Sequence, residues 1–153
     1  MRQSSRQSGF SLVEILAVLV VVGLLFGLVG GSLYRSMDAV KIRRAGKEVV
    51  NALRHTRAQA IVKREEQFLE VDIEERSYRP ADGEPKQLPD DVDVTLRTAS
   101  MDILNEKQGR IRFYPDGSST GGEITLMSGS HVWRVRVAWL TGEITLEASK
   151  GAS

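Results

Sequence analysis

A single carboxylate, Glu14, stands inside an almost wholly hydrophobic run from Phe10 to Val29. Twenty residues of α-helix rise about 30 Å, which is enough to cross the hydrocarbon core of a bilayer. A carboxylate within such a segment costs roughly 2.5–3.5 kcal/mol on insertion scales. A segment that served only as an anchor would gain nothing from this acid. We therefore expect the Glu14 carboxylate to have a partner inside the membrane or inside an assembly. Glu14 is therefore the leading candidate functional residue.

The residue types that enzymes and metal sites need are sparse in the rest of the chain. The 153 residues include two histidines and no cysteine, which leaves little room for a zinc site and none for disulfides. Ser118 and Ser119 have no evident base partner for nucleophilic catalysis. Asp90, Asp91 and Asp93 could bind calcium, but the glycine and distal glutamate of an EF-hand loop are missing, so a solvated loop is favoured. We predict no enzyme activity, no catalytic residue, no metal site and no cofactor.

A glycine-rich segment, Pro115 to Gly122, invites comparison with phosphate-binding loops. Such loops need Gly-Lys-Ser/Thr running into a helix, whereas this segment lies between two predicted strands. Asp116-Gly117 and Gly121-Gly122 supply the positive φ angles that tight turns require. The segment is therefore predicted to be a hairpin connection, exposed enough to contact a partner.

The first fourteen residues resemble a known leader. Met1 to Gly9 is polar, with two arginines and no acid, and short basic flanks stay on the cytoplasmic side. With Ser8-Gly9-Phe10-Ser11-Leu12-Val13-Glu14, this segment resembles the class III leader of type IV prepilins and type II secretion pseudopilins. The resemblance implies that a membrane prepilin peptidase cuts between Gly9 and Phe10 and N-methylates Phe10. It also implies that the apolar helix is retained and that Glu14 pairs with the terminal amine of a neighbouring subunit.

Two simpler interpretations compete with this one. An ordinary signal peptide cut near residues 29–32 would have an unusually long apolar core containing an acid, and a simple single-span anchor leaves Glu14 unexplained. The predicted topology keeps the basic leader in the cytoplasm and exports the large domain. The positive charge that follows the span opposes this topology, because a positive-inside count places the large domain in the cytoplasm. The basic residues concerned are Arg35, Lys41, Arg43, Arg44 and Lys47. We give the cleavage motif more weight than this charge count.

Charge is unevenly distributed along the chain. The formal net charge is +1, and loss of the two leader arginines makes it −1. Residues 30–65 contain nine basic and three acidic residues, whereas residues 66–153 contain ten basic and sixteen acidic ones, so the two parts carry +6 and −6. The acidic part is a poor general binder of nucleic acid. Four basic residues are predicted to face carboxylates of a neighbouring subunit, with intramolecular pairing or plain solvation as alternatives: Arg43, Arg44, Lys47 and Arg54.

The patterning predicts one long helix followed by strands. No proline interrupts residues 10–79, and an apolar stripe at helical spacing continues past the span through Leu33, Met37, Val40, Val49, Leu53 and Ile61. Alternating apolar residues then predict strands at 68–73, 92–96, 110–114, 123–126, 131–139 and 143–146, with a return strand beginning at 78. Residues 80–89 are predicted to be a loop, and Trp133 and Trp139 to share one strand face. The fold class is α+β, with a long helix packed on antiparallel sheets. The predicted divisions are 1–9 (leader), 10–30 (transmembrane helix), 31–65 (soluble half of the helix) and 66–153 (β domain).

The later segments carry a narrower resemblance. The restrictive block is Phe113 to Gly122, and the others are Arg57 to Ile61, Leu88-Pro89 and Trp139 to Gly142. Together they resemble the H-type minor pseudopilins of type II secretion and the related FimT-like minor pilins, all with the type IV pilin-like fold. The resemblance implies a structural subunit near the tip of a periplasmic filament that helps export folded proteins. The implied partners are the prepilin peptidase, other major and minor pseudopilins, the inner-membrane assembly platform and the inner membrane.

The alternative function is DNA uptake or pilus assembly by a FimT-like minor pilin. The DNA-binding members of that branch carry Gly-Arg-x-Arg near the C-terminus, whereas Glu143 and Thr145 occupy the two arginine positions here. A carboxylate repels phosphate, so no nucleic-acid partner is expected. Arg134 and Arg136 are the remaining local candidates for a DNA contact. A membrane-anchored enzyme is a third possibility that no residue supports.

Overall fold

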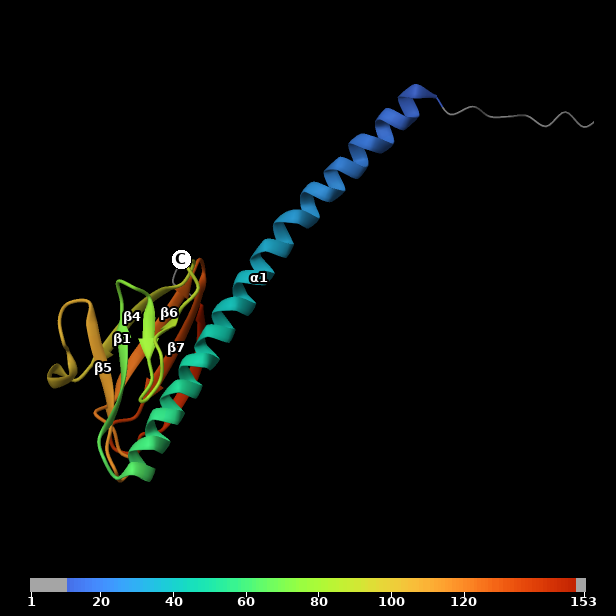
Figure 1. Ribbon diagram of the computed structural model, residues 1–153. Helices are drawn as coiled ribbons and strands as arrows, with labels where there is room; N and C mark the ends of the chain where they lie inside the picture. Colours follow the sequence, from blue (N-terminus) through green and yellow to red (C-terminus); the bar gives the residue numbers. More distant parts are fainter. Residues whose placement is uncertain (1–10, 151–153) are drawn as a thin grey trace, which may run out of the picture. The chain divides into compact units, whose positions relative to one another are not determined.

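The computed structural model describes residues 11–150, with the side chains of residues 11–26 and 39–149 (Figure 1). The chain divides into two compact units, Met1–Met37 and Asp38–Ser153, and one helix contributes to both. The described elements are α1 (Leu12–Lys63), β1 (Gln67–Asp72), β2 (Ser77–Arg79), β3 (Lys86–Gln87), β4 (Asp93–Thr98), the 3-10 turn η1 (Ser100–Asp102), β5 (Gln108–Phe113), β6 (Gly122–Ser128), β7 (His131–Val137) and β8 (Ile144–Lys150).

The helix α1 has a clear start and a clear stop. Ser11 precedes the first turn, and its hydroxyl accepts a hydrogen bond from the Val13 N–H at 3.3 Å, as an N-cap does. At the other end Lys63 closes the helix and Arg64 adopts a left-handed φ of 57°, which turns the chain toward β1. The predicted single helix extending to about residue 64 is confirmed.

The face of α1 that enters the core differs in phase from the predicted stripe. Val49 and Leu53 are buried as expected, but Val40 is 65 % exposed and Ile61 also faces solvent. The side chains of Leu33 and Met37 lie outside the described set. The buried positions follow the spacing of a helix face and consist of Ile42, Ala45, Val49, Val50, Ala52, Leu53, Thr56 and Ala60. Small residues and a threonine complete this face, so counting only large apolar residues wrongly assigned Val40 and Ile61 to it.

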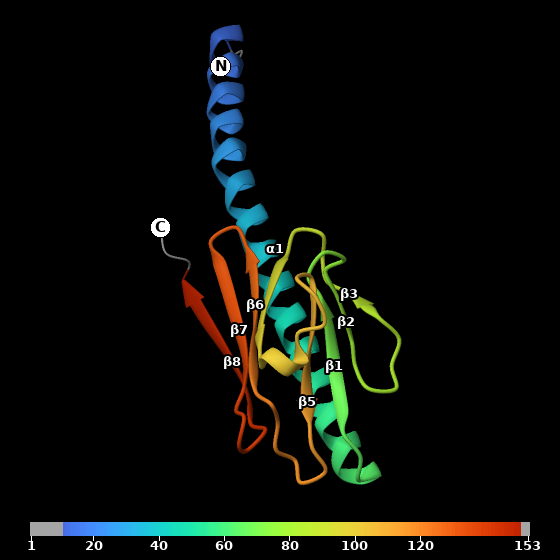
Figure 2. The same cartoon turned by 90° about the vertical axis from the view of Figure 1, so that its left-hand side faces the viewer.

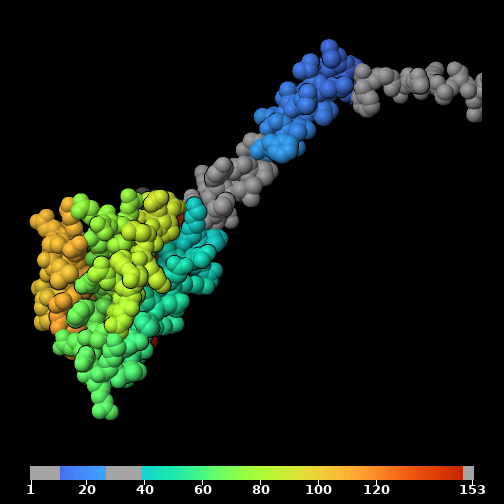
Figure 3. Space-filling model, viewed as in Figure 1, coloured from blue at the N-terminus to red at the C-terminus, as the bar shows by residue number. Residues whose placement is uncertain are grey.

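The strands form two antiparallel four-stranded sheets. Their orders are β3-β2-β1-β5 and β4-β6-β7-β8. Figure 2 shows the strands lying on one side of residues 39–63 of α1, and Figure 3 shows the opposite side of this part of the helix at the molecular surface. The α+β prediction is confirmed, and each predicted strand has a counterpart. The prediction that residues 80–89 contain no strand is wrong, because β3 pairs with β2 through Tyr78 and Lys86.

The core lies between the sheets and α1. Alternate residues of the strands face it, among them Leu69 and Val71 of β1 as predicted, together with Ile111, Phe113, Ile124, Leu126, Val135 and Val137. Trp133 of β7 packs against this cluster. The prediction that Trp139 shares its strand face is wrong, because β7 ends at Val137 and Trp139 is 70 % exposed in the following loop.

The connection between β5 and β6 crosses from one sheet to the other. β5 pairs with β1, and β6 pairs with β4 and β7, so the predicted hairpin is wrong. The glycines nevertheless have the predicted conformations, with φ of 84° at Gly117 and 75° at Gly121. The glycines therefore identified the turns correctly, but the packing of the core determines which strands β5 and β6 pair with.

Candidate assembly site

Glu14 lies in the first turn of α1 and is exposed. It stands three residues after the N-cap Ser11, the spacing of a capping box, and an acid in the first turn is favoured by the helix dipole. This placement was missed at the sequence level, although Ser-x-x-Glu is its signal, and no side-chain hydrogen bond of Glu14 occurs within the described part of the chain. No ion pair of Glu14 occurs within the described part of the chain. Gly9 and Phe10, the other predicted site residues, lie outside the described residues.

The helical stretch around Glu14 is apolar on every side. Every residue from 11 to 26 is exposed, and twelve of the fifteen after Ser11 are valine, leucine, isoleucine or phenylalanine at substantial exposure. A helix that is hydrophobic all round is stable only when something covers it. Within the described residues, no helix is long and apolar enough to cross a membrane. The predicted span, residues 10–30, includes Phe10 and the side chains of residues 27–30, which lie outside the described set.

Three of the sequence blocks meet at Arg57, near the C-terminal end of α1. Its Nε donates to the carbonyl oxygen of Gly117 at 2.9 Å, and its Nη2 donates to that of Thr141 at 3.0 Å. One guanidinium therefore joins the β5–β6 connection and the β7–β8 connection to the helix. The sequence pointed to each block but not to this junction, because the bonded residues are 60 and 84 positions apart.

Glycine is required where the two loops touch. A Cβ at Gly142 would lie 2.1 Å from the carbonyl oxygen of Gly117, and Gly142 has a φ of 62°. The loop is further fixed by bonds from Ser119 N–H to Trp139 O at 3.0 Å and from Gly142 N–H to Ala138 O at 2.9 Å. The β7–β8 loop is thus held in one shape while the Trp139 and Leu140 side chains project into solvent.

A buried acid that sequence reasoning missed organises the outer side of β5. Asp102 is 0 % exposed, and its Oδ1 accepts bonds from Arg110 Nε at 3.0 Å and Arg112 Nη2 at 2.9 Å. Burial alone would raise the pKa of the Asp102 carboxyl, but hydrogen bonding by Thr120, Arg112 and Arg110 lowers it below its ordinary value. The Arg110 guanidinium also stacks over the Phe68 ring at 4.7 Å. No local pattern marks Asp102, so only the tertiary contacts identify it.

The other basic residues singled out in the sequence form two groups, one with ion-pair partners and one without them among the described side chains. Arg136 contacts Glu123 at 2.7 Å and Glu147 at 3.1 Å, and Arg134 lies 4.0 Å from Glu123. The hydrogen bond from Arg136 lowers the pKa of the Glu123 carboxyl. Both candidate DNA-contacting arginines are therefore matched by carboxylates on neighbouring strands. Among described side chains, the helix residues Arg43, Lys47 and Arg54 have no ion-pair partner.

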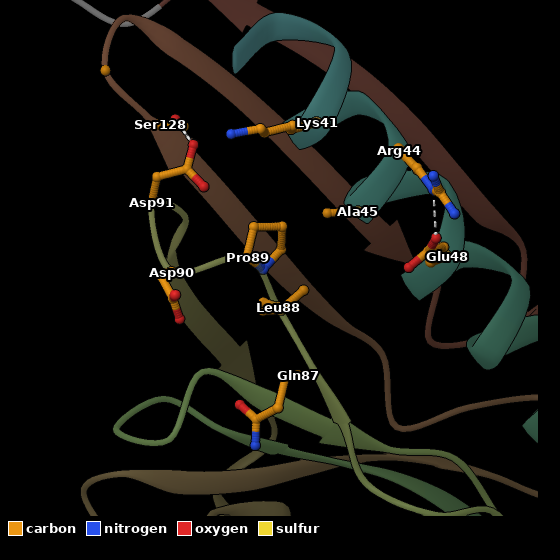
Figure 4. A pocket seen from close by; sticks show the side chains of 11 residues that line it. Lys41, Arg44, Ala45, Glu48, Gln87, Leu88, Pro89, Asp90, Asp91 and Ser128 are labelled. Atoms are coloured by element: carbon orange, nitrogen blue, oxygen red, sulfur yellow. Dashed lines mark hydrogen bonds and ion pairs between the residues drawn. The ribbon is translucent and has the colours of Figure 1, made fainter. Parts of the chain in front are cut away.

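A groove of about 1010 Å³ lies beside α1 in the second unit (Figure 4). Lys41, Arg44 and Glu48 line the helix side, and Asp90 and Asp91 line the opposite loop. Arg44 pairs with Glu48 at 3.0 Å. The described residues contain no cluster of acids or histidines suited to a metal ion. The groove is a charged surface cleft.

Comparison with known proteins decides the family. The model of the family described as "Type II transport protein GspH" matches residues 45–142, and the prokaryotic N-terminal methylation motif matches residues 4–30. The chain belongs to the GspH family. The predicted membership in the H-type branch is thereby confirmed, and the matched core contains the Arg57 junction.

Two relatives extend this result. "Type II secretion system protein H" of Xanthomonas campestris pv. campestris is 36 % identical over 136 residues, covering 89 % of this chain and 80 % of the relative. The structure of the minor pseudopilin EpsH from the Type 2 Secretion System of Vibrio cholerae is similar with a TM-score of 0.56 and 15 % identity, covering 71 % of this chain and 97 % of that one. This likeness confirms the pilin-like α+β fold.

Proposed function

We propose that this GspH-family chain is a minor pseudopilin, a structural subunit near the tip of a type II secretion filament that helps export folded proteins. The observation that carries the proposal is an uncovered apolar helix with one acid in its first turn, joined to a β domain whose described residues contain no cluster of acids or histidines suited to a metal ion. Such a helix is suited to a bundle of like helices, first in the inner membrane and then in the filament.

Glu14 is proposed to neutralise the terminal amine of a neighbouring subunit inside that bundle. The prepilin peptidase is proposed to create this amine by cutting between Gly9 and Phe10 and then to N-methylate Phe10, which agrees with the methylation motif over residues 4–30. A charge buried without a partner costs several kcal/mol, whereas a matched pair removes that cost. The contact would therefore set the axial position of each incoming subunit.

The location follows from the same residues. The apolar segment is proposed to remain as a single-pass anchor in the inner membrane, with the β domain in the periplasm, until the subunit enters the filament with other major and minor pseudopilins at the assembly platform. DNA binding is not proposed, because Arg134 and Arg136 are matched by Glu123 and Glu147.

The test replaces Glu14 with Val and measures secretion and co-purification with other pseudopilins. Insertion into the membrane should persist, since removing the acid eases insertion by roughly 2.5–3.5 kcal/mol. Incorporation should fall by at least about 100-fold if a buried pair worth roughly 3–5 kcal/mol is broken. Leu12→Val, on the same turn, is the matched control and should leave assembly intact. Normal secretion by the Glu14→Val chain at normal expression would refute this role, and an intact mass that includes residues 1–9 would refute the proposed processing.

A further inference from the structure

The edge strands of the two sheets differ in how far they are protected against the addition of another strand. The free side of β5 is covered, because donors from neighbouring segments reach its carbonyl oxygens: Leu104 N–H to Gln108 at 2.9 Å, Thr98 Oγ1 to Arg110 at 2.8 Å and Thr120 N–H to Arg112 at 3.1 Å. β4 adjoins β5, since a Cβ on Gly109 would lie 2.7 Å from Leu96 Cδ2. β3 is only two residues long and begins with Lys86. Short, charged or covered edges are protected against strand addition.

The edge formed by β8 carries Glu147 and Lys150, but it is neither short nor covered by another described segment. It is seven residues long and pairs on one side only, with β7. The bond from Ala138 N–H to Glu143 O fixes which residues face β7. By antiparallel alternation, the N–H and C=O groups of Ile144, Leu146 and Ala148 point to the open side. In the described part of the chain no other segment bonds these groups.

The side of α1 next to this edge is basic and unpaired. A Cβ on Gly46 would lie 3.1 Å from Leu146 Cδ1, so α1 packs against β8 at this level. Helical spacing places three exposed cations, Arg43, Lys47 and Arg54, on the adjoining strip just outside that contact. We call these three residues the basic strip. None has an ion-pair partner among the described side chains, whereas Arg44, on another strip, pairs with Glu48.

We propose that the open edge of β8 binds an extended segment of a neighbouring filament subunit, with carboxylates at alternate positions. An added strand would satisfy the outward backbone groups of β8, and every second side chain would face α1. Carboxylates at those positions would meet the basic strip. The same side chains of the added segment would lie beside Ile144 and Leu146, which are only partly buried by the chain's own core. A second copy of this chain is a poor occupant, because pairing through β8 would bring two basic strips together.

The test uses the full chain in detergent micelles and two fluorescein-labelled peptides of eight residues, alternating valine with glutamate or valine with lysine. Anisotropy titrations at 50 mM salt should show binding of the glutamate peptide and at least tenfold weaker binding of the lysine peptide. Raising the salt to 500 mM should weaken the glutamate complex, because exposed charges are screened. Equal binding of both peptides, or no binding of the glutamate peptide, would overturn the proposal.

Variants separate backbone pairing from charge. Ala148→Pro removes one outward N–H without touching the bonds to β7, so it should weaken the glutamate peptide at least tenfold, while Ala148→Ser should stay within twofold. Replacing Arg43 by Ala should cost roughly threefold to fivefold, and the control Arg44→Ala less than twofold. If the proline variant unfolds, the double variant Arg43→Glu, Lys47→Glu decides alone, since it should now prefer the lysine peptide. An unchanged preference would contradict the proposed site.

The inference rests on the proposed function only for the identity of the partner as a filament subunit. Co-purification of the Ala148→Pro chain with other pseudopilins keeps the two questions apart. If the unmodified chain co-purifies and both the proline and the double-glutamate variants do so equally well, the edge site fails and the proposed function stands. If the unmodified chain never co-purifies, the proposed function fails. A dimer of the chain alone that Ala148→Pro abolishes would identify a second copy as the occupant and overturn the proposal.

Discussion

Replacing Arg57 with Ala should destabilise the β domain strongly, although the side chain is not in the apolar core. The change removes two hydrogen bonds, to the carbonyl oxygens of Gly117 at 2.9 Å and Thr141 at 3.0 Å. Hydrogen bonds from a charged group contribute about 1.5–3 kcal/mol each, and the partial exposure of Arg57 favours the lower end. The expected loss is therefore about 2–4 kcal/mol. For a unit of this size, this corresponds to a decrease in Tm of roughly 8–16 °C.

The assay is thermal and urea unfolding of the full chain in detergent, followed by the fluorescence of Trp133 and Trp139. Trp139 sits in the loop that Arg57 holds, so its emission should change before the main transition in the Arg57→Ala variant. Arg57→Lys should recover at most half of the loss, because an ammonium lacks the planar fork that reaches two carbonyls.

Arg54→Ala is the matched control, one turn earlier on the same helix. Its side chain is exposed and has no ion-pair partner among the described residues, so the free energy of unfolding should change by less than about 0.5 kcal/mol. If Arg57→Ala changes stability no more than Arg54→Ala does, the junction is not a stabilising contact and the reasoning is wrong.

Three further predictions concern charge. Asp102→Asn should lower the free energy of unfolding by about 3–5 kcal/mol, because it leaves Arg110 and Arg112 without their buried partner. Since folding lowers the pKa of Asp102, its contribution is full above the unfolded value of 3.8 and disappears as the pH falls through the folded pKa; urea midpoints between pH 5 and pH 2 should therefore decline more steeply in the unmodified chain than in Asp102→Asn. Burial and the nearby Glu48 raise the pKa of Tyr78 to about 12, so the stability that depends on the neutral phenol should hold below pH 10 and be lost between pH 10 and 12, with ultraviolet absorbance reporting the ionisation. Anisotropy titration with duplex DNA at near-physiological salt should show no binding tighter than micromolar, and Arg136→Ala should not change this; tight binding abolished by that variant would favour a DNA-uptake role.

Apart from β3, the sequence alone predicted the order and type of the main helix and strands. The absence of proline from residue 10 to residue 79 and the alternation of apolar residues after it indicated one helix and then strands, because these periodicities are local properties of the chain. The leader was likewise recognised from the sequence, since Gly9, Phe10 and Glu14 stand at the spacing of a class III prepilin leader. These site residues remain predictions, because Gly9 and Phe10 lie outside the described residues and Glu14 has no ion-pair partner among the described side chains.

Only the tertiary structure decided which segments meet. The loop from Pro115 to Gly121 had the composition of a hairpin turn, yet it crosses between sheets because β5 pairs with β1 instead of β6. Asp102 carried no local signal, and its role depends on the pairing that brings β5 beside it. The open edge of β8 likewise follows from strand order, which long-range burial of apolar residues determines. A chain's local preferences fix its elements, whereas the partners of each element depend on contacts among residues far apart in sequence.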